Sequence, residues 1–186
     1  GCQDEVCQVN FADCGTPPDR LVVTGSLKFD DAPTDRATEE VLSRKHWARI
    51  AASHQVWIVG STQEGEEQMA LDVYQSMRDK HPSLRLILVP RHKERFDAVA
   101  ALARQSGFQV KRRSETQAAS DRTWDAQTVI LIDTIGELRH WWGVGQIATV
   151  GGSFGDRGGQ NMLEPAGYGS AVSFGPNTRN FKEIAN

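Results

Sequence analysis

The chain has 186 residues, of which 39% are hydrophobic and 24% charged, and its mean hydropathy is -0.47. These values are typical of a soluble globular protein and exclude a disordered chain, and no run of about eighteen apolar residues is present to span a bilayer. The net charge of -3, from 21 basic and 24 acidic residues, gives no reason to expect nucleic acid as a partner.

The first fifteen residues carry all the cysteines of the chain, Cys2, Cys7 and Cys14, with no histidine nearby to complete a familiar zinc pattern. We therefore expect free thiols. The segment also lacks the basic start and apolar stretch of a secretory signal. We expect this segment to be an internal part of a longer chain, and the last residues, NFKEIAN, stop inside a predicted helix. Both ends predict a piece of a longer protein.

Apolar stretches rich in β-branched residues alternate with helical patterns along the chain. Strands are expected at 21–25, 56–60, 84–90, 128–133, 147–152 and 171–175, with a weaker one at 108–112. Helices are expected at 38–53, 64–80 and 94–106, and a polar surface loop at 113–126. The alternation predicts an α/β fold with a Rossmann-like, doubly wound parallel sheet. We expect this domain to span 21–186, truncated at its C-terminus, and 1–20 to be a connection from a preceding lobe.

The loops that follow the predicted strands are polar or rich in glycine, as in GSTQEGEE at 60–67 and GGSFGDRGGQNMLEP at 151–165. In a parallel sheet such loops gather at one edge, where ligands bind. Several helix starts at that edge would present unpaired backbone N–H groups to an anion, and glycine lets backbone approach a ligand closely. Each loop alone is also explained as an ordinary turn. The set as a whole favours a ligand site.

Two common nucleotide fingerprints are absent, because the first predicted strand runs into GSLKFD, which matches neither GxGxxG nor the P-loop. This argues against an NAD enzyme or a P-loop ATPase. Lys28 in this loop is either a point charge for a phosphate or a sugar carboxylate, or a solvated surface lysine. Arg91 follows a strand that ends in proline and has the geometry to clamp a phosphate with two hydrogen bonds. His92, Lys93 and Arg95 beside it also fit a solvated helix start.

Two glutamates, Glu137 and Glu164, lie near predicted helix starts, where the helix dipole favours a carboxylate even without a ligand. Asn161 precedes Glu164 by three residues, so both side chains can point to the same side of a first helical turn. Asn161 also fits a plain N-cap, with Glu164 completing a capping-box-like pair. A carboxylate in such a place can instead accept both hydroxyls of a ribose. The residues alone leave these alternatives open.

Six ordered motifs carry a resemblance to a known family. They run from about residue 15 to residue 186: TGSLKFD, STQEGEE, LILVPRHKERF, VILIDTIGELR, VGGSFGDRGGQNMLEPAGYG and FGPNTRNFKEIA. In these motifs the chain resembles the bacterial 3-deoxy-D-manno-octulosonic acid (Kdo) transferases, which are glycosyltransferases of the GT-B type. The resemblance implies the C-terminal, nucleotide-binding lobe of a two-lobed enzyme.

The resemblance also implies a reaction and its site. Members of the family transfer Kdo from CMP-Kdo to a lipid A precursor in the synthesis of the lipopolysaccharide inner core, at the cytoplasmic face of the inner membrane. The general base and most of the peripheral membrane contact then belong to the protein's own N-terminal lobe. Lys28 matches the lysine that stabilises the transition state. The CMP-binding residues implied are Pro90, Arg91, Ile135, Gly136, Glu137, Asn161, Met162, Leu163 and Glu164.

A few motif positions depart from the family. Gln63 and Gln160 stand where the family often has histidine, so neither can titrate, whereas Ile135 in place of methionine keeps an apolar contact. No DxD pair or histidine cluster is placed to hold a cation. We therefore expect metal-independent transfer with no cofactor, in which helix starts, Arg91 and Lys28 stabilise the leaving phosphate.

Two alternatives remain at this point. The same lobe could use a UDP-sugar donor, as in another transferase or an epimerase, and would then prefer UDP to CMP. A non-catalytic α/β binding module would tolerate replacement of Arg91 or Glu164 without loss of any binding activity. On the leading interpretation the chain binds CMP-Kdo but transfers no sugar alone, because the general base lies outside it.

Overall fold

The structure is a computed structural model that describes residues 1–25, 32–115 and 124–185. The chain forms two compact units, Gly1–Ala32 and Pro33–Asn186. The predicted boundary between a connection and a Rossmann-like domain, at residue 20, stays a prediction.

The first unit is built around a short helix, α1 (Glu5–Asp13), and a 3-10 turn, η1 (Pro18–Arg20). Asp4 caps α1, because its carboxylate accepts a hydrogen bond of 2.7 Å from the backbone N–H of Cys7. The strand predicted at 21–25 is wrong: Val23 forms only an isolated parallel bridge with Cys2. These apolar residues pair inside their own unit and do not join the sheet. Cys2, Cys7 and Cys14 are free thiols, as expected.

The second unit contains a six-stranded parallel sheet, in the order β3-β4-β2-β1-β5-β6. Its strands are β1 (Gln55–Thr62), β2 (Leu84–Pro90), β3 (Gln109–Arg112), β4 (Thr128–Leu131), β5 (Ile147–Val150) and β6 (Ala171–Phe174). The strands predicted for this unit are thereby confirmed, including the weaker one. The two central strands are apolar along most of their length because helices cover both faces of the sheet.

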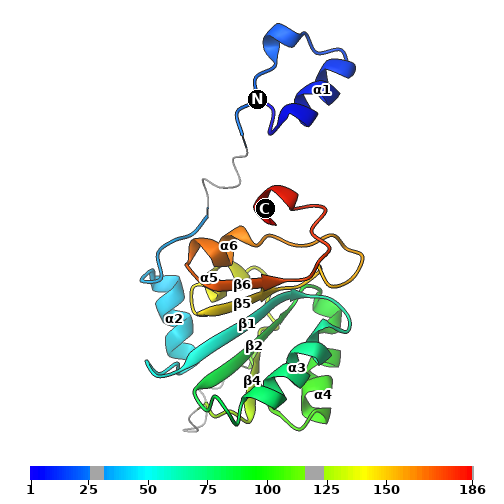
Figure 1. Cartoon of the computed structure of the whole chain (residues 1–186). Helices are drawn as coiled ribbons and strands as arrows, with labels where there is room; N and C mark the ends of the chain where they lie inside the picture. Colours follow the sequence, from blue (N-terminus) through cyan, green and yellow to red (C-terminus); the bar gives the residue numbers. More distant parts are fainter. Residues whose placement is uncertain (26–31, 116–123, 186) are drawn as a thin grey trace. The chain divides into compact units, whose positions relative to one another are not determined.

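Alternate side chains of the central strands enter two separate cores. Ile58 and Ile87 belong to one core, which α2 (Glu39–Trp47), α5 (Leu138–Trp142) and α6 (Leu163–Gly167) help to cover. Val59 and Leu88 belong to the other, beneath α3 (Glu66–Met77) and α4 (Phe96–Gln105). Figure 1 shows the two sets of helices on opposite faces of the sheet. This is the predicted doubly wound arrangement.

The helices differ in length from the sequence prediction. The helix expected at 38–53 ends at Trp47, and Arg49 then turns the chain with a φ of 53°. The helix expected at 94–106 begins as a 3-10 turn, η3 (Lys93–Arg95), and continues as α4. A last turn, α7 (Lys182–Ala185), forms where the final helix was predicted.

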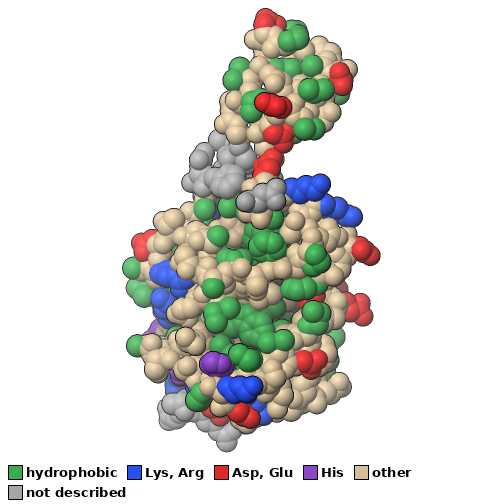
Figure 2. Space-filling model, in the orientation of Figure 1, with side chains coloured by type: hydrophobic (Ala, Val, Ile, Leu, Met, Phe, Trp, Pro, Cys, Tyr) green, Lys and Arg blue, Asp and Glu red, His purple; other side chains and the backbone are tan. Residues whose placement is uncertain are grey.

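The two edge strands are less buried than the others: β3 has no buried residue, and in β6 only Val172 is partly buried. Figure 2 shows apolar side chains gathering over the middle of the second unit, near β1, with most charged side chains closer to the margins of that face. Helices therefore do not cover the sheet across its whole width.

The side on which the chain adds new strands to the sheet changes between β1 and β5. From β1 the chain moves to β2, β3 and β4 on one side, and it then returns to β5 and β6 on the other. The helix that follows β1 and the helix that follows β5 consequently lie on opposite faces, which leaves a crevice at the carboxyl ends of these two strands. This crevice is the first place to look for a ligand site.

Packing at Gly60 in β1 gives a test of the fold. A Cβ added at Gly60 would lie 2.5 Å from a ring carbon of the buried Trp142 and 2.9 Å from a methyl carbon of Leu138. We expect Gly60→Ala to lower the free energy of unfolding by about 1–3 kcal/mol, as overpacked cores do, in a denaturant titration. Gly155→Ala is the control, because the space around Gly155 is open. Equal stabilities of the two variants would contradict this packing.

Candidate functional site

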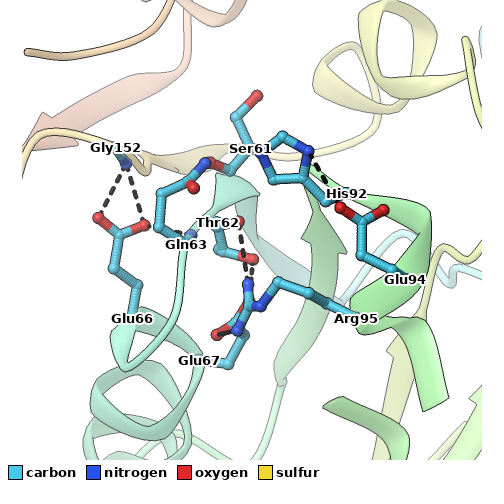
Figure 3. A network of polar contacts seen from close by, with 9 residues as sticks. All are labelled: Ser61, Thr62, Gln63, Glu66, Glu67, His92, Glu94, Arg95 and Gly152. Atoms are coloured by element: carbon cyan, nitrogen blue, oxygen red, sulfur yellow. Dashed lines mark hydrogen bonds and ion pairs between the residues drawn. The ribbon is translucent and has the colours of Figure 1, made fainter. Parts of the chain in front are cut away.

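The end of β1 has an unusual backbone at Ser61. Among the described residues only Ser61 and Arg49 combine a positive φ with a side chain, and Ser61 has a φ of 56° although it is only 6% exposed. This left-handed conformation costs a non-glycine residue about 1–2 kcal/mol. The register of β1 against β2 also shifts between Gly60 and Thr62. Figure 3 shows the Ser61 hydroxyl pointing away from Glu66 and Glu67. Such local strain is typical of functional edges.

The first turn of α3 carries a buried carboxylate that holds the loop after β5. Both oxygens of Glu66 accept the backbone N–H of Gly152, at 2.8 and 3.0 Å, and Oε2 also accepts the N–H of Gln63 at 2.8 Å (Figure 3). Gly151 has to be glycine here, because an added Cβ would collide with this carboxylate and with the backbone of Ser61. Glu66 thus joins the loops on the two sides of the crevice.

The next residue, Glu67, holds the loop after β2 in the same way. Its fully buried carboxylate forms a two-pronged ion pair with Arg95, at 2.7 and 2.8 Å, and accepts the hydroxyl of Thr62 at 2.5 Å (Figure 3). The hydrogen bonds that Arg95 donates to Glu67 raise the pKa of Arg95 above its usual value. Arg95 is therefore not part of a merely solvated helix start, which was one reading of the sequence.

After β2, Pro90 and Arg91 lie directly beside the end of β1. Pro90 pairs with Thr62 in the sheet, and the Arg91 N–H donates to the Thr62 carbonyl at 3.2 Å. The Arg91 side chain is exposed. A fixed backbone with an exposed guanidinium is the arrangement that a phosphate clamp requires.

After β4, Glu137 is engaged by side chains from three other elements. Its Oε2 lies 3.0 Å from Arg113 Nε, 3.3 Å from Trp141 Nε1 and 3.5 Å from Arg44 Nε. Burial would raise the pKa of Glu137, but the hydrogen bond and charge of Arg113, with the charge of Arg44, hold this pKa below its usual value. Its side chain caps no helix N-terminus, so capping does not explain this residue.

The two residues before Glu137 lie at the edge of the sheet, where Gly136 offers accessible main chain and Ile135 an exposed apolar side chain. Gly136 has a φ of 85°, and nothing lies within 4 Å of the position of an added Cβ. Ile135 is 68% exposed, which is unusual for so large an apolar side chain. The segment therefore offers an open main chain beside an apolar contact.

After β5, Glu164 lies in the first turn of α6, but Asn161 lies two residues before this helix, which begins at Leu163 with Met162 as its N-cap, so the predicted helix start and N-cap at Asn161 are wrong. Asn161 Oδ1 accepts the N–H of Leu163 at 3.0 Å, and its Nδ2 lies 3.5 Å from Glu164 Oε1. Met162 is only 2% exposed, and its side chain belongs to the core. Any contact of Met162 with a ligand therefore has to use its main chain.

The fold brings these three segments to one edge. Strands β4, β2, β1 and β5 are consecutive neighbours, so the loops that follow them are adjacent, and α5 packs against both α6 and β1. Both α5 and α6 have only five residues. Their dipoles are therefore weaker than the sequence interpretation assumed, and the free backbone N–H groups carry more of the positive potential. Lys28 lies outside the described residues.

No family model matches the chain. The curated proteins and the solved structures that are similar to it point to one family. The chain is 38% identical over 183 residues to a 3-deoxy-D-manno-octulosonic acid transferase of Haemophilus influenzae, covering 98% of the chain and 41% of that protein. It is 39% identical over 175 residues to the transferase of the same name from Bordetella pertussis, covering 92% of the chain and 39% of that protein.

A solved structure matches as well. It is the C-terminal CMP-Kdo binding domain of WaaA from Acinetobacter baumannii, with 32% identity and a TM-score of 0.69, and the match covers 79% of this chain and 74% of that one. The chain belongs to the Kdo transferase family. It spans about two fifths of the length of the curated relatives that it matches. The predicted Rossmann-like GT-B lobe is thereby confirmed.

Several residues at this edge of the Kdo transferase lobe were not identified as site residues from the sequence. Glu66, Glu67 and the strained Ser61 were seen only as part of a polar loop. A signal existed for Glu67, since it precedes the buried Ala70 and Leu71 by three and four residues and so lies on the buried face of α3. The left-handed Ser61 has no comparable signal.

In the ranges that the structure describes, no helix combines the length and apolar character needed to cross a bilayer. The His, Cys, Asp and Glu side chains of the same ranges form no group of three or more that could hold a metal ion. The expected metal independence stays a prediction.

The environment of Glu137 predicts a pH dependence of stability. Because its pKa is lowered in the folded state, its contribution is complete above the unfolded-state pKa of about 4.3 and is lost as the pH falls through the lower folded value. We expect Glu137→Gln to lower the free energy of unfolding by about 1–2 kcal/mol at pH 7, with the difference from wild type shrinking below pH 4.3. Denaturant titrations between pH 7 and pH 3 measure this.

The control for this pH series is Glu94→Gln. The Glu94 carboxylate is 71% exposed and lies 3.9 Å from His92, so its loss should cost less than about 0.5 kcal/mol at any pH. A difference between Glu137→Gln and wild type that does not change with pH would show that Glu137 titrates normally.

Proposed function

We propose that this chain is the donor-binding part of a Kdo transferase and that the carboxyl edge of its sheet binds CMP-Kdo. The observation that supports this most strongly is the meeting of the three implied CMP segments, 90–91, 135–137 and 161–164, at one edge of a family-typical lobe. The name of the Acinetobacter baumannii structure describes that domain as CMP-Kdo binding, which supports the same donor here.

The proposed chemistry follows from the donor. When the bond between the Kdo anomeric carbon and the phosphate oxygen of CMP breaks, its electron pair stays on that oxygen, and the phosphate gains negative charge. Arg91 is an exposed cation at this edge and is proposed to pair with the phosphate. The main chain at Gly136 is open enough to approach the nucleotide, and Ile135 offers an apolar contact to its base or ribose.

Two carboxylates are proposed for different tasks at this site. Glu164 is half-buried in the first turn of α6, 3.5 Å from the side chain of Asn161 just before the helix, and we assign it to the ribose hydroxyls. Glu137 is already paired through Oε2 with Arg113 and Arg44. Its first task is therefore to fix the loop after β4, and its contact with CMP is limited to Oε1 and the main chain.

The remaining features of the reaction are proposals about the whole protein. The acceptor is a lipid A precursor, at the cytoplasmic face of the inner membrane, and membrane contact is peripheral and made mainly outside this chain. The general base belongs to the N-terminal lobe, and Lys28 stabilises the transition state. Transfer needs no metal.

An NMR titration of the ¹⁵N-labelled chain with CMP, UDP and ADP tests the donor. We expect CMP to bind tighter than UDP and ADP and to shift the amide signals of residues 91, 135–137 and 161–164. Arg91→Ala should weaken CMP binding about tenfold, as loss of a charge-assisted hydrogen bond does.

The control for Arg91→Ala is Arg104→Ala. Arg104 is also exposed but lies near the end of α4, at the opposite edge of the sheet, so its loss should leave CMP binding unchanged. An equal or absent response to the three nucleotides would overturn the proposal, and a preference for UDP would replace the donor with a UDP-sugar.

A further inference from the structure

The loop that follows β6 lies against the glycine-rich loop that follows β5. We call residues 175–181 the β6 loop and residues 151–160 the β5 loop. Three side chains of the β6 loop donate hydrogen bonds to three consecutive carbonyl groups of the β5 loop. The donors are Asn177, Arg179 and Asn180, and the acceptors, in the same order, are Gly155, Asp156 and Arg157, at 3.0, 2.6 and 2.9 Å. The β6 loop therefore holds the main chain of the β5 loop.

The first residues of the two loops are joined at a buried serine. Ser153 is 0% exposed, and its hydroxyl oxygen accepts the N–H of Gly175 at 2.7 Å. The Ser153 carbonyl accepts the N–H of Asn177 at 3.0 Å. A Cβ added at Gly175 would collide with this carbonyl, so the two main chains are in direct contact. The glycine at 175 is therefore needed for the contact between the loops.

The last residues of the β5 loop are held in the same way. The carbonyl of Gly158 accepts the N–H of Asn180 at 3.0 Å, and the N–H of Gly159 donates to the carbonyl of Gly152 at 2.8 Å. Gly158 has a φ of 91°, and a Cβ added there would lie 2.7 Å from Asn180 Nδ2. The proposed nucleotide segment 161–164 begins two residues after Gly159. The β6 loop thus contacts the main chain that leads directly into this segment.

The β6 loop is itself anchored in the core. Phe181, at its end, and Ile184 in α7 pack against the core cluster that includes the buried Met162. Met162 belongs to the segment 161–164, so this segment and the β6 loop share one core. The donors on the β6 loop are therefore held in place by apolar packing, which makes the β5 loop pre-organised for a ligand.

We propose that the β6 loop positions the β5 loop for the nucleotide, with Asn177 and Asn180 as positioning residues. Their amide groups hold the main chain of the β5 loop, and neither residue is among those assigned to CMP. Without these donors, the β5 loop adopts more conformations, and a smaller fraction of molecules has residues 161–164 in the binding geometry. The apparent affinity for CMP falls by that fraction. This inference rests on the proposed function, because it concerns the same nucleotide site.

The test is an NMR titration of CMP into the ¹⁵N-labelled double variant Asn177→Ala/Asn180→Ala. We expect the Kd for CMP to rise about tenfold, because two hydrogen bonds of about 0.5–1.5 kcal/mol each are lost. Neither substitution removes a charge, so a weaker attraction for the phosphate does not explain the loss. At CMP saturation, the amide signals of residues 161–164 should match those of wild type, because the bound geometry is the same. A residue that touched the nucleotide would shift them.

The single variants Asn177→Ala and Asn180→Ala should each raise the Kd about threefold, and they give the test if the double variant does not fold. Gln105→Ala is the matched control. Gln105 is an exposed amide at the end of α4, at the opposite edge of the sheet, so its loss should leave the Kd unchanged.

The outcomes separate this inference from the proposed function. If wild type binds CMP and the folded asparagine variants bind it equally well, the positioning role is wrong and the proposed function stands. The same conclusion follows if the saturated signals of residues 161–164 differ between the variants and wild type. If wild type does not bind CMP, the proposed function is wrong and the positioning role is wrong with it.

Discussion

The carboxylate of Glu66 is the interaction on which the candidate site depends. It accepts the N–H groups of Gly152 and Gln63 in a buried position, so it joins the loop after β5 to the loop after β1 across the crevice of the sheet. Hydrogen bonds to a charged group are worth about 1.5–3 kcal/mol each. Gly151 has no space for a Cβ because the carboxylate and the β1 backbone occupy it. Gly151 and Gly152 are therefore needed for this clamp, by which we mean the Glu66 carboxylate and the two N–H groups that it accepts.

At the other loops of this edge, too, some residues fix the main chain and others stay available to a ligand. Glu67 and Arg95 fix the loop after β2 and leave the Arg91 side chain exposed. Arg113 fixes Glu137, and the neighbouring Ile135 stays exposed. Catalysis by charge stabilisation depends on donors that are in place before the reaction begins. A buried polar framework beneath an open edge supplies that condition.

Much of the fold could be predicted because its signals are local. β2 was predicted with its observed bounds, since seven buried residues in a row leave a continuous apolar stretch in the sequence. The segment 21–25 carries the same signal, yet it belongs to the first unit, where Val23 bridges Cys2. An apolar stretch shows that a segment is to be buried or paired, and it does not identify the partner.

From the sequence, the site could be predicted only where its residues lie close together within one motif. Asn161 and Glu164 are three positions apart, so their spacing was enough to place their side chains together, although the helix begins only at Leu163. Besides Trp141, four positions along the chain, Glu137 has partners in α2 and in the turn after β3, and no sequence pattern joins segments so far apart. The same holds for the Glu66 contact with Gly152, which spans 86 positions. Long-range polar pairing is decided by the assembled sheet.

The affinity of the Glu66→Gln chain for CMP tests the dependence of the site on this clamp most directly. Glutamine keeps the size of the side chain but removes the charge, and its NH₂ group would place a donor against the N–H of either Gly152 or Gln63. If the clamp holds the edge in its binding geometry, the variant stays folded, with unchanged amide signals in β2 and α4, and binds CMP about tenfold more weakly than wild type. Wild-type affinity in a folded Glu66→Gln chain would show that the nucleotide site does not depend on the clamp.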